Sequence, residues 1–368
     1  MTQTKIKQPP RARPPRLDGF RRTPVGRLLF RLRDSYVLRR IGRAVFTVWV
    51  VVTGVFFMVR LLPGNPVSTY ISKLTAEGMD YETAAAAAAS LYTFDPNTPI
   101  WQQYLDYLWG VCRLDFGTTL SQIPVTEKIA DHLPWTLFSV GLALLLAVIA
   151  GLLLGMAMAY RRGGILDHTA SALGSTMHAI PNYLVALIIV TVGATQLGLF
   201  DYADMRGTVT PGVEPSFSPE FLGDALYHAI LPVFTYFITT AGTWALLMKA
   251  STTQVLGEDY VMVARARGLG GRRIGSSYVG RNAVLPVVAQ IATKAGFVVG
   301  GAIFVELIFD YEGVGITLYN AINTRDYALT QGILLIITMT VIFSNLVADL
   351  TYGVLDPRIR TSGKEVER

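Results

Sequence analysis

The chain has 368 residues, of which 51% are apolar and only 16% are charged, whereas soluble domains average about 25% charged residues. This balance excludes an ordinary soluble protein and predicts a membrane protein. The single cysteine, Cys112, excludes an intrachain disulfide, and the four histidines show no metal-ligand spacing. The sequence also lacks the G-x-x-x-x-G-K-[ST] phosphate-binding loop, which excludes a nucleotide site of that class.

The net charge of +6 is concentrated at the N-terminus. Residues 1–43 hold 13 Lys or Arg against two acidic residues, so the remainder of the chain is slightly acidic. A basic tail often binds nucleic acid, but beside a membrane span it is more typical of a cytosolic anchor on anionic lipid. We interpret residues 1–43 as a disordered or surface-bound cytoplasmic leader. A cleaved signal peptide is disfavoured, because the leader is long and no small-residue cleavage site follows it.

Six apolar segments reach the ~20 residues that a bilayer core requires. They predict transmembrane helices over residues 44–62, 135–159, 172–200, 229–248, 283–309 and 327–348. The third segment contains Pro181, which removes a backbone hydrogen bond and should kink the helix. We therefore predict an all-α membrane protein with a six-helix domain over residues 44–352 and a cytoplasmic tail over residues 353–368.

The charge of the connecting loops assigns each loop to one side of the membrane. Residues 63–132 carry three basic and eight acidic residues, and residues 201–228 carry one basic and five acidic residues. Residues 249–282 instead carry six basic and two acidic residues. Because cytoplasmic loops are rich in Lys and Arg, we place the first two loops outside and the third inside, with both termini in the cytoplasm. Within the long external loop we expect helices at 81–91 and 100–111.

The longest polar, basic interruption between two spans, residues 257–286, predicts a helix–glycine–helix unit. Acidic residues at 258–259 stand where a first helix would begin, and arginines within 265–267 stand where it would end. Gly268 follows as a stop signal, so the helix complements its own dipole and has a glycine just past its end. A second helical segment is expected over about 272–282, before a proline opens the next apolar run.

This stretch resembles the cytoplasmic EAA loop of ABC-importer permeases, in the form used by the dipeptide, oligopeptide and nickel subfamily. The matching residues are Asp259-Tyr260-Val261, Ala264-Arg265-Ala266, Gly268-Leu269, Arg281-Asn282-Ala283 and Pro286. Met262 and Val263 stand where the motif has a Glu and its first Ala, a departure that this subfamily commonly shares. Further matches run in order from about residue 38 to 360, among them Leu61-Leu62-Pro63-Gly64-Asn65-Pro66, Gly313-Val314-Gly315 and Asp356-Pro357-Arg358.

The resemblance implies a type I ABC-importer permease fold in a prokaryotic cell membrane, as a non-catalytic subunit without a cofactor. The implied partners are a second, related permease, two ABC ATPases that bind ATP and Mg, an external substrate-binding protein and membrane lipid. The expected cargo is di- or oligopeptides, with nickel chelates or oligosaccharides as the alternative. The rival class is a secondary transporter that works alone, and it is disfavoured because we find no internal repeat and no acid–base relay.

We predict that the 249–286 loop is the ATPase-coupling site. Its predicted contact residues are Asp259, Tyr260, Ala264, Arg265, Gly268, Arg273, Arg281, Asn282 and Pro286. Tyr260 and Ala264 share one helix face at i and i+4, where the small alanine would permit close approach of a partner. The arginines have a second interpretation, since a cytoplasmic loop is basic whatever it binds.

Two ionisable residues, Lys294 and Glu306, fall within the fifth apolar segment. Such groups are functional candidates by default, because leaving one against lipid costs about 3 kcal/mol or more. They lie about 18 Å apart along a helix, so they cannot pair within it. Both are candidates for the translocation path. A snorkelling or intersubunit role for Lys294 and an interfacial position for Glu306 are open alternatives.

Overall fold

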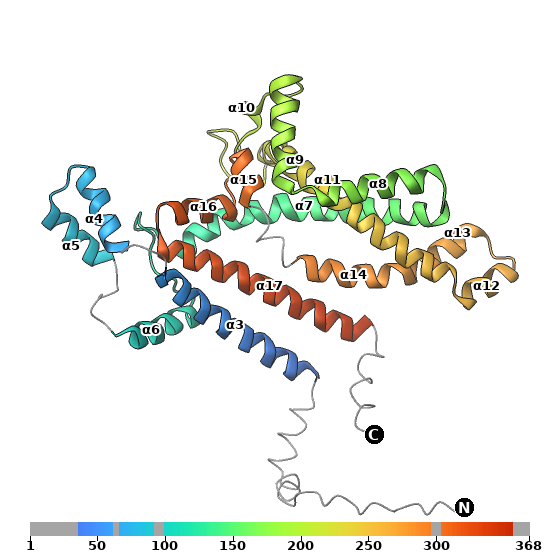
Figure 1. Cartoon of the computed structure of the whole chain (residues 1–368), viewed down its shortest axis with the longest axis horizontal. Helices are drawn as coiled ribbons and strands as arrows, with labels where there is room; N and C mark the ends of the chain where they lie inside the picture. The colour runs from blue at the N-terminus through green and yellow to red at the C-terminus, as the bar shows by residue number, and fades with distance from the viewer. Residues whose placement is uncertain (1–35, 62–65, 92–98, 296–302, 356–368) are drawn as a thin grey trace, which may run out of the picture.

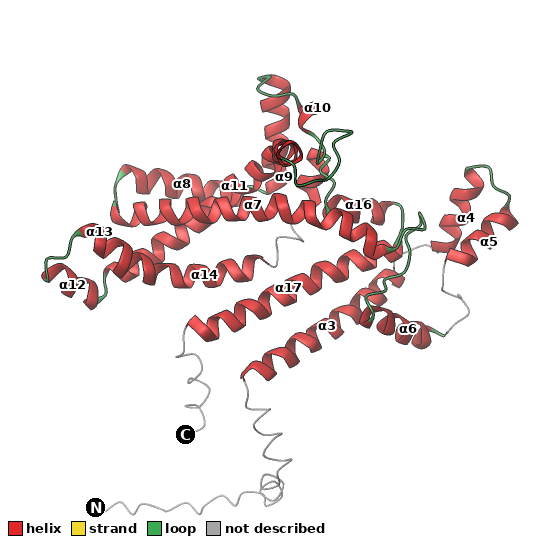
Figure 2. Ribbon diagram, turned by 180° about the vertical axis from the view of Figure 1, so that it is seen from behind, coloured by secondary structure: helices red, strands yellow, loops and turns green. Residues whose placement is uncertain are grey.

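A computed structural model describes residues 36–61, 66–91, 99–295 and 303–355 of the chain (Figure 1). Over these residues the chain is helical, and the only extended pairing is an isolated bridge between Thr118 and Pro124. Figure 2 shows the same helical character from behind. The predicted all-α class is therefore confirmed. Most of the leader and the end of the tail lie outside the described residues.

The N-terminal third contains one long helix and three short ones. They are α3 (Tyr36–Leu61), α4 (Pro66–Ala76), α5 (Tyr81–Leu91) and α6 (Ile100–Cys112). Helix α3 begins before the apolar span predicted from residue 44, and α5 and α6 confirm the two helices expected in the external loop. Helix α3 packs along α17 (Tyr327–Leu355), where Val52 and Leu335 share a buried cluster. The first and last long helices are therefore neighbours.

Two long helices that run in the same direction, α7 (Val125–Tyr160) and α11 (Pro219–Leu256), form the centre of the fold. Glycines allow them to approach closely. An added Cβ at Gly155 would lie 2.3 Å from the carbonyl oxygen of Ala245, and one at Gly151 would lie 2.4 Å from the Cβ of Trp244. The two helices are therefore closest along the C-terminal half of this pair.

The third predicted span is interrupted at Pro181. Helix α8 (Ile165–Ala179) ends before Pro181, and α9 (Asn182–Ile188), continued by a π-helical segment, η1 (Ile189–Gln196), leaves at 100° to it. Ile180 is extended, because the ring of a following proline disfavours the helical conformation. We expected a single kinked span, and the structure instead has two helices at 100° to each other. Helix α8 packs on α11.

The C-terminal half contains a short-helix hairpin and three further helices before α17. They are α12 (Asp259–Ala266), α13 (Gly271–Arg273) with its π-helical continuation η2 (Ile274–Gly280), α14 (Arg281–Ala295), α15 (Ile303–Phe309) and α16 (Val314–Asn323). A four-residue helix, α10 (Tyr202–Met205), lies in the loop before α11. Helix α16 lies in the segment between the last two predicted spans, residues 310–326.

Four described helices are long and apolar enough to cross a membrane, and the bent α8–α9–η1 pair makes a fifth if it counts as one span. The predicted span 283–309 falls on α14 and α15, and residues 296–302 between them lie outside the described residues. The described part therefore supports a multi-pass membrane protein without giving six separate spans. In both views α4 and α5 lie at one end of the molecule and α12 at the other (Figures 1 and 2).

Candidate functional site

The 249–286 loop folds as the predicted helix–glycine–helix unit. Helix α12 begins directly after Glu258 and is capped at its end by Arg267. Gly268 follows with φ +72°, a left-handed conformation that favours glycine because it has no Cβ. The amides of Gly268 and Leu269 then donate to the carbonyls of Arg265 and Ala264 at 2.9 and 3.3 Å. These bonds close the helix end and turn the chain toward α13.

The boundaries of this loop differ from the prediction at both sides. Residues 249–256 are the last turns of α11, so the non-helical connection begins at Gly257. On the other side α13, η2 and α14 follow one another without a gap from Gly271 to Ala295. Pro286 therefore lies inside α14 and does not open a separate span. Pro286 is exposed, and α14 continues past it although the local pattern predicted a break there.

A small apolar core holds the two arms of the unit together. Val261 and Ala264 of α12 pack against Ile274 and Val279, and all four side chains are buried. At the same place Gly275 lies against Tyr160 at the end of α7, since an added Cβ there would meet the hydroxyl oxygen at 3.2 Å. The hairpin therefore packs against the C-terminal ends of the two central helices, α7 and α11.

Helix α12 turns a different face outward from the one we predicted. Ala264 is only 2% exposed and faces the hairpin's own core, whereas Tyr260, Met262 and Val263 are 40%, 55% and 56% exposed. The i, i+4 spacing placed Tyr260 and Ala264 together, but buried Val261 rotates the helix so that Ala264 points inward. The outward apolar surface is thus formed by Tyr260, Met262 and Val263.

The remaining predicted contact residues lie around this surface or along the second arm. Asp259, Arg265, Arg273, Arg281, Asn282 and Pro286 are all exposed. The Asn282 side chain donates to the carbonyl of Tyr278 at 2.7 Å, a bond within its own helix. The hydroxyl of Ser251 on α11 donates to the carbonyl of Ala283 at 2.7 Å, which ties α11 to α14.

The structure describes the side chain of Glu306 but not that of Lys294, the two candidates for the translocation path. For Lys294 the structure describes the backbone, near the end of α14, but not the side chain. Glu306 on α15 is 1% exposed, and its carboxylate accepts from the Thr136 hydroxyl at 2.6 Å and the Ile316 amide at 3.0 Å. Thr136 accepts in turn from the Val314 amide at 2.8 Å. The carboxylate therefore caps α16 inside the protein, and its role in a translocation path stays a prediction.

The comparisons with known proteins identify the family. Residues 151–361 match the family described as the binding-protein-dependent transport system inner membrane component. The chain belongs to this family. The dipeptide transport system permease protein of Escherichia coli is 33% identical over 343 residues, which cover 89% of this chain and 98% of the relative. The di/tripeptide transport system permease of Pseudomonas aeruginosa is 30% identical over 341 residues, with the same two coverages.

The family confirms the resemblance carried by the 257–286 motif. This binding-protein-dependent permease is a membrane subunit of an ABC importer, and it belongs to a family of inner membrane components. A more distant relative, the glutathione transport system permease of Salmonella typhi, is 29% identical over 327 residues, covering 89% of this chain and 99% of the relative. The relatives are transport permeases, which do not themselves catalyse a reaction.

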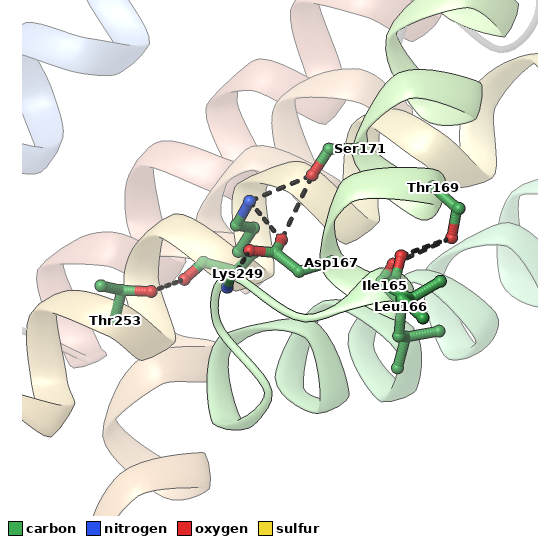
Figure 3. Close-up of polar contacts among 8 residues, drawn as sticks. Ile165, Leu166, Asp167, Thr169, Ser171, Lys249 and Thr253 are labelled. Atoms are coloured by element: carbon green, nitrogen blue, oxygen red, sulfur yellow. Dashed lines mark hydrogen bonds and ion pairs between the residues drawn. The ribbon is translucent and has the colours of Figure 1, made fainter.

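Sequence reasoning missed a polar cluster in this permease, near the C-terminal end of α11 (Figure 3). Lys249 of α11 pairs with Asp167 at the start of α8, with Nζ and Oδ1 2.5 Å apart. The sequence marks both residues as isolated charges. Asp167 is the only acidic residue in the short basic segment after Arg161, and Lys249 is the first charge after an uncharged span. Nothing in the sequence, however, indicated that these two charges meet.

Proposed function

We propose that this permease forms half of the translocation pathway of an ATP-driven importer for di- or oligopeptides. The observation that carries the proposal is the similarity to a dipeptide transport permease over 98% of that relative's length. The relatives named for dipeptides, for di- and tripeptides and for glutathione all act on peptides by name, which favours a peptide cargo. Nickel chelates and oligosaccharides are the alternative cargoes, and a binding assay with the external delivery protein separates them.

The partner ATPases dock on the 249–286 loop in this proposal. Three observations support this assignment: α12 exposes an apolar surface of Tyr260, Met262 and Val263, the arginines of the same hairpin are exposed, and the hairpin packs against α7 and α11. An apolar centre with a charged rim is typical of a protein interface. ATP and Mg are bound by the ATPases, and closure of the ATPase pair would move the permease helices through this hairpin.

The assembly has six spans in each permease, with both termini in the cytoplasm and a second, non-identical permease completing the pore. An external substrate-binding protein delivers cargo to the acidic loops 63–132 and 201–228. The arrangement of α4–α5 and α12 at opposite ends of the molecule is compatible with this topology (Figure 1). The charge of the loops supports the same orientation.

Substitution of the loop glycine tests the docking assignment. Gly268→Val places a β-branched residue at φ +72°, a backbone conformation that costs an ordinary residue about 1–2 kcal/mol. Where ATPase docking requires this conformation, the same free energy corresponds to roughly a tenfold loss of ATPase binding. We expect ATPase chains to be lost when the tagged permease is purified from membranes, while its membrane insertion is unchanged. Gly270→Val is the matched control, because Gly270 has φ −60° and open space at its Cβ position.

Normal ATPase recovery with Gly268→Val would contradict the docking role. A separate outcome tests the rival class of protein. If purified permease carries peptide in vesicles without any ATPase, it is a secondary transporter and the importer proposal fails.

A further inference from the structure

The Asp167–Lys249 cluster, formed by Asp167, Ser171, Lys249 and the amide of Gly163, is a closed polar network. The Lys249 ammonium donates to the Asp167 carboxylate at 2.5 Å and to the Ser171 hydroxyl at 3.0 Å. The Ser171 hydroxyl donates to the same carboxylate at 3.3 Å, and the Gly163 amide donates to its second oxygen at 2.9 Å. Figure 3 shows Lys249 reaching from α11 toward Asp167 and Ser171 on α8.

The cluster joins three parts of the fold. Asp167 is 4% exposed and lies at the start of α8, and its bond to Gly163 holds the turn that connects α7 to α8. Lys249 lies on α11, where Gly155 of α7 approaches the backbone closely. An added Cβ at Gly155 would lie 3.0 Å from the backbone nitrogen of Lys249. A pair of opposite charges with three further hydrogen bonds is thus placed where α7, α8 and α11 meet.

The position of Lys249 along α11 connects the cluster to the 249–286 loop. From Lys249, α11 continues without a break to Leu256, roughly 10 Å at 1.5 Å per residue, and α12 begins at Asp259. Helix α11 is a rigid rod over this distance, so a displacement of α12 moves Lys249 with it. The ion pair passes that displacement to α8, whose other end leads to the 100° bend at Pro181.

Two further contacts join α8 to α11 beyond the charged cluster. Gly174 lies directly against Gly242, and an added Cβ at Gly242 would be 2.4 Å from the Gly174 Cα, so this point has no interlocking side chains. One exposed hydrogen bond follows, between the Thr243 hydroxyl and His178 Nδ1 at 2.9 Å. The charged cluster has more fixed hydrogen-bond directions than this single bond, so we assign to it the larger part in setting the rotation and register of α8 on α11.

We propose that the Asp167–Lys249 ion pair is the positioning link through which movement of the 249–286 loop reaches α8 and the bend at Pro181. The inference rests on the proposed function, because it requires ATPases that act on the loop. Without the pair, the Gly174–Gly242 approach and the exposed Thr243–His178 bond remain to join α8 to α11, so movement of the loop reaches α8 less effectively. ATP hydrolysis then continues while peptide transport is lost, which is a different result from the loss of ATPase docking expected for Gly268→Val.

The test compares peptide transported per ATP hydrolysed in the complete importer, reconstituted in lipid vesicles with its binding protein and the dipeptide Ala-Ala. Asp167→Asn and Lys249→Met each remove one charge. We expect the ratio of transport to hydrolysis to fall roughly tenfold, within the 5–150-fold range that coupling between sites usually spans. Lys249→Arg keeps the charge and the donors, so it should retain most of the ratio.

The double variant Asp167→Asn with Lys249→Met separates a lost link from a stranded buried charge. A single neutralisation leaves its partner unpaired, which alone destabilises a protein, whereas the double variant leaves no charge behind. We expect the double variant to assemble normally and to remain uncoupled. Thr169→Ala and Thr253→Ala are matched controls on α8 and α11, because these hydroxyls bond only to carbonyls of their own helices.

Three outcomes overturn the inference. The double variant has a normal transport ratio, or transport and hydrolysis fall together in the same proportion, or the double variant does not assemble with the ATPases. In the last case the pair serves assembly alone. If the unmodified importer shows no Ala-Ala transport and no ATPase partner, the proposed function fails instead, and the two failures are distinguishable.

Discussion

At the residue scale, one buried carboxylate organises the region where α7, α15 and α16 meet. Glu306 and Thr136 accept from the first amides of α16, and these two side chains come from α15 and α7. A carboxylate at a helix N-terminus satisfies amides that have no partner inside the helix and interacts favourably with its dipole. Gly313 and Gly315 leave space for it, since an added Cβ at Gly313 would lie 2.3 Å from the carboxylate oxygen Oε1.

Removing this carboxylate should destabilise the protein. Glu306→Ala leaves the Thr136 hydroxyl and the Ile316 amide buried without an acceptor, at a cost of about 1–3 kcal/mol for each group. We expect a lower midpoint of thermal unfolding in detergent and a milder loss for Glu306→Gln, which keeps one acceptor oxygen. Glu312→Ala is the control, because Glu312 lies in the same segment but is exposed. Equal stability of Glu306→Ala and the control would contradict the capping role.

At the scale of elements, the packing of α7 on α11 depends on particular glycines. Gly155→Ala would push a methyl group to 2.3 Å from the Ala245 carbonyl oxygen, and overpacking of this kind costs about 1–3 kcal/mol. Gly141→Ala in the same helix has nothing within 4 Å of the added carbon, and it should be neutral or stabilise by up to about 1 kcal/mol.

The measurement for this pair of variants is the same thermal unfolding in detergent. We expect Gly155→Ala to unfold at a lower temperature than the parent and Gly141→Ala to match or exceed the parent. If the two variants behave alike, α7 and α11 do not pack through Gly155. The hairpin of the 249–286 loop would then have a less direct mechanical connection to α11 than the structure indicates.

At the scale of the whole molecule, the side assigned to each loop can be measured with the single natural cysteine. Cys112 ends α6 and is exposed, in the loop that we place outside. We expect a membrane-impermeant maleimide to modify Cys112 in intact cells. In a Cys112→Ser background, Arg273→Cys should react only after the membrane is permeabilised, because the 249–286 loop lies in the cytoplasm in the proposed topology. Modification of Arg273→Cys in intact cells would reverse that topology.

The sequence by itself determined those features that depend on neighbouring residues or on overall composition. Scarcity of charge predicted a membrane protein, Pro181 predicted a kink where the structure has a bend between two helices, and the order of charges around Gly268 predicted the hairpin. The ordered motifs also predicted the family. Each of these signals is local, because helix ends, proline breaks and glycine turns are set by a few consecutive residues.

Only the tertiary structure decided what depends on residues far apart in the chain. The rotation of α12 follows from burial of Val261 against η2, so the exposed surface includes Met262 and Val263 in place of Ala264. Helix α14 likewise continues through Pro286, although the local sequence predicted a break there. The partners of Asp167 and Glu306 come from other helices, and a single sequence carries no signal for which distant donor meets which acceptor.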